Sequence, residues 1–216
     1  MNLILIGPQG SGKGTQAELL GKKFNLPTLS VGQLYRRQIL QQTKIGKIAK
    51  RFVESGKLVP NKITENLLNQ EIKNKKYKAG VIFDGFPRNF EQNRFLEKIL
   101  DIAQVILIHI SQQEILKRLG GRYVCDCGQT YNLNSESSEK PRRRFICDKC
   151  GKKLKQRPDD NPQAIRQRLK IYEKETMSLF KYYKKQHKLI TISGEQRVYP
   201  VFKAILLALR HKGIKP

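Results

Sequence analysis

A glycine-rich stretch near the start of the chain has the residue types that bind phosphate. It reads GPQGSGKGTQ over residues 7–16 and directly follows an apolar run at residues 3–6. Between a strand and a helix, such a turn directs backbone N–H groups and the positive end of the helix towards one point. Lys13 would reach the β- and γ-phosphates of a nucleoside triphosphate there. The residues predicted to hold this triphosphate are Gly10, Ser11, Gly12, Lys13, Gly14 and Thr15.

Asp84 is a candidate for binding a divalent cation. It follows the apolar residues 81–83, which read as a buried strand. An uncompensated carboxylate at the end of a buried strand is costly. Coordination of Mg²⁺ through its water shell therefore explains Asp84 better than a structural N-cap does.

The four cysteines form two closely spaced pairs. Cys147 and Cys150 have the C-x₂-C spacing of a zinc knuckle, whereas only one residue separates Cys125 from Cys127. Three outcomes are open: zinc on all four cysteines with an adjusted turn, zinc on three with a neighbouring aspartate (Asp126 or Asp148), or no metal. We expect a structural zinc, because unligated thiols would give so small a segment little core. Its predicted ligands are Cys125, Cys127, Cys147 and Cys150.

The elements that position these residues alternate between strands and helices. Short buried strands are predicted from the apolar runs at residues 3–6, 81–83, 105–110 and 189–192. Helices are predicted at residues 15–24, 63–77 and 92–100, and a later helix begins at Asn161-Pro162. This alternation predicts a parallel sheet covered by helices.

Length and charge limit the class of protein. A chain of 216 residues suits one substantial core with small insertions. No apolar run approaches the roughly 20 residues of a membrane helix, and the first residues do not read as a signal peptide. We therefore expect a cytoplasmic protein without membrane contact, whose cysteines stay reduced. The net charge of +25 would attract polyanions. The lysines are scattered, so nucleic-acid contact is expected only as nonspecific attraction.

Several motifs together resemble those of the adenylate kinase family. GPQGSGKGTQ and DGFPRNFEQ, the second at residues 84–92, are very similar to family motifs, and the family loop reads G-K-G-T. Further resemblances follow in order at residues 30–36, 56–60, 118–122, 156–161 and 194–198. The resemblance implies an α/β fold with a parallel five-stranded sheet flanked by helices. It also implies a core of residues 1–29, 60–117 and 160–216, a monophosphate-binding insertion at 30–59 and a lid insertion at 118–159. A monomer is the default expectation.

The same resemblance implies reversible, Mg²⁺-dependent phosphoryl transfer from ATP to AMP, giving two ADP. Guanidinium groups suit this reaction because they stay charged and bind phosphate oxygens through two N–H groups. The catalytic residues implied are Lys13, Asp84, Arg88, Arg122, Arg157 and Arg168. Arg122 and Arg197 would join the glycine-rich stretch in binding ATP. The implied AMP-binding residues are Val31, Arg36, Lys57, Val59, Gly85, Arg88, Gln92, Arg157 and Arg168.

Three positions depart from the family pattern. Val31 stands where the family has threonine, Gln33 where it has aspartate, and Tyr123 where it often has a further arginine. The hydroxyl lost at position 31 would lie near the monophosphate base. The related UMP/CMP kinases also lack it, so they give an alternative substrate class. A basic zinc-ribbon protein that binds nucleic acid is the alternative from a different class.

Overall fold

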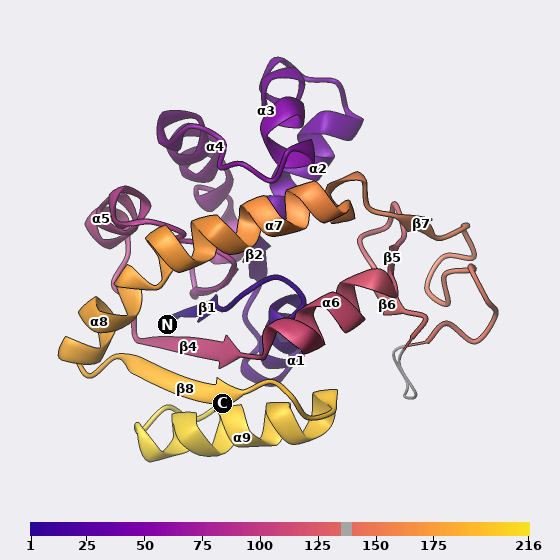
Figure 1. Cartoon of the computed structure of the whole chain (residues 1–216). Coiled ribbons are helices and arrows are strands. Elements are labelled where there is room, and N and C mark those ends of the chain that lie inside the picture. The colour runs from indigo at the N-terminus through magenta and orange to yellow at the C-terminus, as the bar shows by residue number, and fades with distance from the viewer. Residues whose placement is uncertain (135–139) are drawn as a thin grey trace.

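The computed structural model describes residues 1–134 and 140–216. Residues 135–139 fall within the lid insertion expected at 118–159 and lie outside the described residues. The described elements form a larger parallel sheet, helices on both of its faces, and a smaller antiparallel sheet to one side (Figure 1). The α/β fold predicted from the sequence is therefore confirmed.

Five parallel strands form the larger sheet, in the order β2-β3-β1-β4-β8. Their bounds are Asn2–Ile6 (β1), Thr28–Ser30 (β2), Val81–Asp84 (β3), Gln104–His109 (β4) and Leu189–Ser193 (β8). Four of these strands coincide with predicted apolar runs. The pattern alone does not identify β2, because Leu29 is its only fully buried residue.

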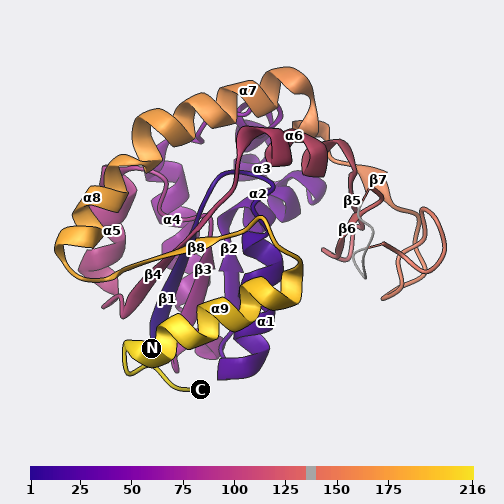
Figure 2. The same cartoon turned by 60° about the horizontal axis from the view of Figure 1, so that its bottom comes forward.

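Helices cover both faces because the strands alternate their side chains between two cores. In β1, Leu3 and Leu5 pack with residues of α1 and α9, whereas Ile4 and Ile6 pack with α2 (Val31–Leu40), α4, α5 and α8. Figure 2 shows α1 and α9 together on one side of the sheet. None of the described helices is both long and apolar enough to cross a bilayer. The bounds are Lys13–Phe24 (α1), Asn61–Ile72 (α4), Phe90–Ile99 (α5), Gln112–Gly120 (α6), Pro162–Ile171 (α7), Ser178–Lys185 (α8) and Val198–His211 (α9).

Two helices differ from their predicted extents. The helix expected over 63–77 ends at Ile72 and is followed by a 3₁₀ turn at Lys75–Tyr77. The later helix begins after Asn161 as expected, but a π-helical segment at Tyr172–Thr176 separates α7 from α8. In this segment the Thr176 hydroxyl donates to the Arg88 carbonyl oxygen at 2.8 Å. The irregular turn therefore contacts a predicted site residue, as π-bulges often do.

The two expected insertions contain their own local structure. Residues 30–59 hold α2 (Val31–Leu40) and α3 (Lys44–Glu54). Residues 118–159 hold the smaller sheet, in the order β6-β5-β7, built from Arg122–Val124 (β5), Thr130–Asn132 (β6) and Lys155–Gln156 (β7). This sheet encloses a small core of Cys125, Tyr131, Cys147 and Leu154. A 3₁₀ turn at Pro158–Asp160 leads back to α7.

Gly56, after α3, is predicted to be intolerant of a side chain. Its φ of +72° is left-handed, and a Cβ there would collide with the carbonyl group of buried Ala164 in α7. Gly213 has a similar φ of +76°, but a Cβ there would meet no described atom within 4 Å. We expect Gly213→Ala to cost about 1 kcal/mol from backbone strain. Gly56→Ala should cost about 3 kcal/mol, because overpacking adds to that strain.

Urea unfolding of both variants and the parent, with zinc present throughout, measures the two losses. Equal losses for Gly56→Ala and Gly213→Ala would contradict the prediction, because the contact between residue 56 and α7 would then add nothing to the loss of stability.

Candidate functional site

A cleft of about 750 Å³ lies at the carboxyl ends of the central strands. β1 stands between β3 and β4, so chain segments diverge to either side at its end, the usual place for a ligand in an open parallel sheet. The cleft gathers most of the residues predicted to bind nucleotides. Those lining it are Gly10, Ser11, Gly12, Lys13, Gly14, Thr15, Arg36, Asp84, Gly85, Arg88, Arg122, Arg157, Arg168 and Arg197.

The glycine-rich stretch forms the floor of the cleft between β1 and α1. Gly12 caps α1 with a φ of +87°, a conformation that a side chain would strain. Lys13 follows as the first helical residue, and its Nζ donates to the Pro8 carbonyl oxygen at 2.6 Å. The loop therefore folds back against the Lys13 side chain, and the N-terminus of α1 lies beside it. This is the arrangement that binds phosphate in other proteins.

The positive charges in the cleft lie close enough to perturb one another. Burial, with the nearby Arg88, Arg122 and Arg168, lowers the pKa of Lys13 to about 7, although Asp84 acts in the opposite direction. Burial also lowers the pKa of Arg36 to about 9, and Arg157 adds to this effect. The cleft thus concentrates cations that an incoming anion would stabilise.

Asp159 and Asp160 neutralise part of this charge. Arg157 pairs with Asp159 at 3.1 Å, and Arg168 pairs with both aspartates at 2.9 and 3.0 Å. Arg122 forms a bidentate pair with Asp160. Burial opposes ionisation of Asp159, yet the surrounding arginines, led by Arg157, lower its pKa to about 2. The sequence indicated these aspartates only as part of a motif and did not identify them as partners of the arginines.

Three predicted phosphate-binding cations lack such partners. Lys13, Arg36 and Arg88 make no ion pair within 4 Å in the described parts of the chain. Arg88 Nε donates only to the Gly85 carbonyl oxygen, at 3.0 Å. These groups retain the capacity to bind phosphate oxygens.

A smaller cavity of about 70 Å³ adjoins the cleft. Arg36, Gly85, Arg88, Arg157 and Arg168 line both spaces, so the cavity opens beside the cationic groups. The remaining residues predicted to bind the monophosphate line the smaller cavity: Val31, Lys57, Val59 and Gln92. The structure therefore brings together the residues that the sequence assigned to the second nucleotide.

Asp84 ends β3 and faces the glycine-rich loop. A Cβ built at Gly14 would stand 3.5 Å from Asp84 Oδ2, so a longer side chain would fill the space between loop and carboxylate. Magnesium usually takes one or two carboxylates and keeps several waters and substrate phosphates. A carboxylate facing an open, phosphate-binding loop fits that cation.

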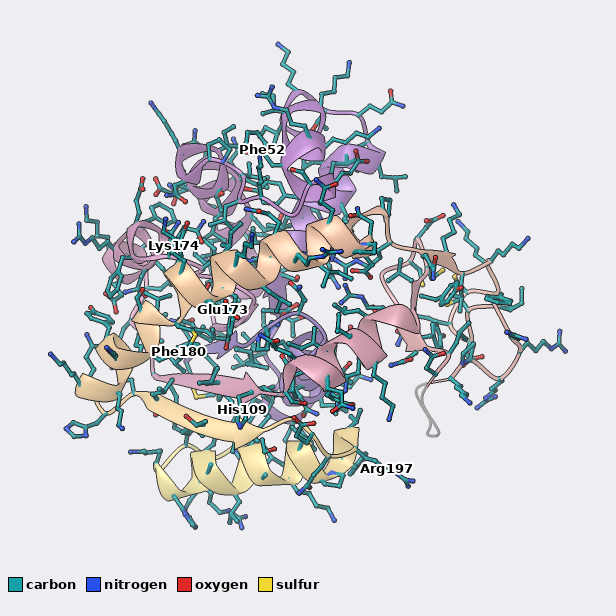
Figure 3. All side chains as sticks on the ribbon, viewed as in Figure 1. Phe52, His109, Glu173, Lys174, Phe180 and Arg197 are labelled. Carbon is teal, nitrogen blue, oxygen red and sulfur yellow. The ribbon has the colours of Figure 1, made fainter. Side chains whose placement is uncertain are left out.

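Two further arginines lie at the triphosphate side of the cleft. Arg197 lines the cleft but lies exposed at its rim, immediately before α9, and points outward in Figure 3. Arg118, which sequence reasoning did not select, donates to the carbonyl oxygens of Gly194 at 2.8 Å and Gly10 at 3.4 Å. It also pairs with Glu114 at 2.7 Å. Arg118 thus ties the phosphate loop to the segment before α9.

Three positions depart from the family pattern. Val31 lines the smaller cavity, and the positions of Gln33 and Tyr123 are as follows. Gln33 is exposed and lines the cleft, as do Gly32 and Arg36. Tyr123 packs its ring against Phe145, with centroids 5.3 Å apart. It therefore contributes to the small core of the second sheet.

The four thiols converge in the smaller sheet. Their Sγ atoms all lie within 4.8 Å of one another, with 3.3 Å between Cys125 and Cys150 and 3.6 Å between Cys127 and Cys147. A tetrahedral zinc with Zn–S bonds of about 2.3 Å requires sulfurs about 3.8 Å apart. The cluster therefore fits a Cys₄ metal site. Asp126 and Asp148 do not belong to it.

The short C-x-C pair reaches this geometry through a glycine turn. Gly128, with a φ of +93°, donates its N–H to the Cys125 carbonyl oxygen at 2.9 Å, and the chain turns back into β6. Burial favours the neutral form of the Cys147 thiol, but hydrogen bonds from the Tyr131 hydroxyl and nearby backbone N–H groups lower its pKa to about 6. This thiol is thus prepared to act as a thiolate ligand.

The sheet order and the paired sites define the class of protein. A phosphate loop at the end of the central strand and a second, cation-lined cavity across the cleft are the features of a P-loop nucleoside monophosphate kinase fold. A family model described as adenylate kinase matches residues 5–188. The chain therefore belongs to the adenylate kinase family.

Individual relatives agree with this assignment along the whole chain. A protein named adenylate kinase from Acetivibrio thermocellus is 39% identical over 221 residues and covers 100% of each chain. One from Caldanaerobacter subterraneus is 37% identical, covering 97% of this chain and 96% of its own. One from Methanosarcina barkeri is 35% identical, with 97% and 99% covered. These matches support the adenylate kinase interpretation and give no support to the UMP/CMP kinase or nucleic-acid-binding alternatives.

The low pKa of Lys13 predicts proton uptake when the triphosphate binds. At pH 8 the free side chain, with a pKa of about 7, is mostly neutral, and a bound polyanion favours its protonated form. We expect up to about one proton to be taken up per ATP bound at pH 8 and less at pH 6, where Lys13 is already charged. Calorimetry in two buffers of different ionisation enthalpy measures this number.

Lys13→Arg is the matched control, because a guanidinium stays charged at both pH values. At pH 8 this variant should take up fewer protons on binding ATP than the parent, by up to about one proton per ATP bound. Identical uptake by the two proteins would contradict a low pKa at Lys13.

Proposed function

We propose that this protein catalyses reversible phosphoryl transfer from ATP to AMP, giving two ADP. The observation that carries the proposal is the cluster of partly buried cations shared by the cleft and its adjoining cavity. Phosphoryl transfer between two nucleotides brings several negative charges together, so its catalysis depends on positioning and charge neutralisation. A binding protein for a single nucleotide would need only one of these two spaces.

We assign ATP to the glycine-rich side of the cleft. Backbone N–H groups of residues 10–15 and the α1 N-terminus would hold its phosphates, with Lys13 at the β- and γ-positions. Arg122 lies across this cleft, and Arg197 lies at its rim. Arg118 would hold the segment before α9 in a fixed position relative to the loop, because it donates hydrogen bonds to carbonyl oxygens of both.

We assign AMP to the smaller cavity. Arg36 and Arg88 would bind its phosphate, since both line the boundary between the two spaces and make no ion pair in the described structure. Val31, Lys57, Val59, Gly85 and Gln92 would surround the nucleoside. The two phosphate chains would then meet at the boundary between the two spaces.

Arg157 and Arg168 lie at that boundary and would neutralise the charge on the group in transfer. Both are held by Asp159, and Arg168 also by Asp160, so their positions are fixed before nucleotides bind. Pre-positioned charges avoid reorganisation during the reaction. Direct in-line transfer needs no covalent intermediate on the protein.

Asp84 would hold Mg²⁺ through its water shell, in the space that Gly14 leaves open. When bound with ATP, the cation neutralises charge on the β- and γ-phosphate oxygens. The carboxylate of Asp84 also opposes the loss of the proton from Lys13, which keeps part of the lysine charged for phosphate binding.

The two inserted segments would act as lids over a core of residues 1–29, 60–117 and 160–216. Residues 30–59 contribute Val31, Arg36 and Val59 to the smaller cavity, and residues 118–159 contribute Arg122 and Arg157 to the cleft. Movement of either segment towards its nucleotide would exclude water, which would otherwise accept the phosphoryl group. We propose a monomer in the cytoplasm.

We also propose that the four cysteines hold a structural zinc. Four protein ligands leave no open coordination position, so the ion would stabilise the lid and take no part in the transfer. The small core of this segment, centred on Tyr131 and Leu154, would otherwise depend on few apolar contacts.

Removal of zinc is therefore expected to destabilise the protein. We expect one zinc per chain by elemental analysis, and a strong chelator should lower Tm by about 10 °C, consistent with a loss of several kcal/mol. Cys127→Ser should lose both the metal and the chelator effect. Asp126→Asn, a neighbouring change that spares all thiols, should retain both. Absence of zinc together with chelator-independent melting would reject the site.

The proposed reaction is tested by a coupled assay of ADP formation from ATP, with AMP, UMP, CMP or GMP as the acceptor. AMP should be the fastest acceptor. Arg88→Ala should lower kcat/KM by on the order of 10³, because it removes an unpaired cation from the transfer site. Arg94→Ala, at an exposed arginine of α5, the helix that follows Arg88, should change little. Faster transfer to UMP or CMP, or ATP hydrolysis that needs no acceptor, would reject the proposal.

A further inference from the structure

The smaller cavity contains a pair of hydroxyl groups that the family motifs do not identify. Tyr35 Oη and Thr64 Oγ1 lie 2.7 Å apart, and both side chains line the cavity with Val31 and Gln92. Tyr35 is 6% exposed and Thr64 3%. Their hydrogen bond joins α2 to α4, and Tyr35 lies one helical turn after Val31. A buried polar pair therefore stands beside the valine that lacks a hydroxyl.

The direction of this hydrogen bond follows from the partners of Thr64. Its Oγ1 is 3.4 Å from the Val59 carbonyl oxygen and 3.3 Å from the Pro60 carbonyl oxygen. Carbonyl oxygens only accept, so the Thr64 hydroxyl proton is directed towards them. Burial raises the pKa of Tyr35, so its phenol stays protonated and donates to Thr64. The Tyr35 oxygen then keeps an unused lone pair, which makes it an acceptor.

Gln92 presents the complementary group. Its Oε1 accepts from the Arg88 backbone N–H at 2.8 Å, and its Nε2 donates to Asn61 Oδ1 at 2.9 Å. These two partners fix the orientation of the amide. One N–H of Nε2 remains without a partner in the described structure, so Gln92 offers a donor.

We propose that Tyr35 is a specificity-determining residue that selects monophosphates whose base carries an amino group next to a ring-nitrogen acceptor. This inference rests on the proposed function. The Gln92 N–H would donate to the ring nitrogen, and the Tyr35 oxygen would accept from the exocyclic amine. Adenine and cytosine present this edge. Hypoxanthine, guanine and uracil present a ring N–H beside a carbonyl oxygen. The Gln92 N–H would then face another donor, and the Tyr35 oxygen would face another acceptor.

The proposal also gives a consequence of Val31. The valine offers no polar group, so it cannot contribute to reading the base edge. Tyr35 lies four residues later on α2, and side chains at this spacing share one face of a helix. Base selection would thus depend on a hydroxyl one turn further along the same helix.

The test compares AMP with IMP, and CMP with UMP, as acceptors for the parent protein and for Tyr35→Phe. The variant removes only the hydroxyl. We expect the AMP-to-IMP ratio of kcat/KM to fall about tenfold, since a site built to bond one edge discriminates through its buried polar groups. The CMP-to-UMP ratio should fall in parallel. The change should lie in the KM for the monophosphate, with kcat and the KM for ATP within about twofold.

Two further variants separate base selection from folding. Thr64→Ser keeps a hydroxyl for Tyr35 to bond and should retain the parent ratios. Tyr182→Phe removes a hydroxyl that bonds Glu97, outside both spaces, and should also retain them. Unchanged ratios in folded Tyr35→Phe would overturn the inference alone. A parent protein that transfers phosphate to none of the four acceptors would instead overturn the proposed function.

Discussion

Repulsion among closely spaced, partly buried cations is the constraint on which the rest of this structure depends. Lys13, Arg36 and Arg88 stand in one cleft without carboxylate partners in the described structure, and their pKa values fall because burial and like charge penalise the charged forms. Such an arrangement costs stability in the free protein and gains it when an anion enters. Asp159 and Asp160 limit this cost, because they compensate the arginines that are fixed at the boundary and leave the remaining cations for ligands.

The fold provides this charge density through the ends of parallel strands. The phosphate loop follows β1, and Asp84 ends the neighbouring β3, so backbone N–H groups and a carboxylate meet at one edge of the sheet. Arg88 joins them at this edge, in the loop after β3. Arg36, Arg122 and Arg168 come from α2, β5 and α7, and Arg157 immediately precedes the 3₁₀ turn at Pro158–Asp160. Segments outside the larger sheet therefore supply much of the positive charge of the cleft.

The sequence predicted those parts that local pattern determines. Four strands, the loop and the helix start at Asn161 follow from hydrophobic runs, glycine spacing and capping residues. The family resemblance supplied the fifth strand, because β2 buries only Leu29 and has no pattern of its own. The roles of Asp159, Asp160 and Arg118 were missed, since each depends on contacts between distant segments. The sequence left open whether the short C-x-C pair completes a Cys₄ cluster, because its closure depends on the left-handed turn at Gly128.

Phosphate binding and base selection depend on different interactions, and the departure at Val31 lies on the side of the base. Every nucleotide carries phosphate, so the arginines and Lys13 supply affinity that does not distinguish one base from another. Selection must come from a few neutral groups in the smaller cavity, where a single misplaced donor leaves a buried group unpaired. Such groups can exchange positions, provided that the cavity keeps the same pattern of donors and acceptors. Loss of a hydroxyl at Val31 is therefore compatible with selection of adenine when Tyr35 presents an oxygen to the same cavity, whereas loss of an unpaired arginine has no local substitute.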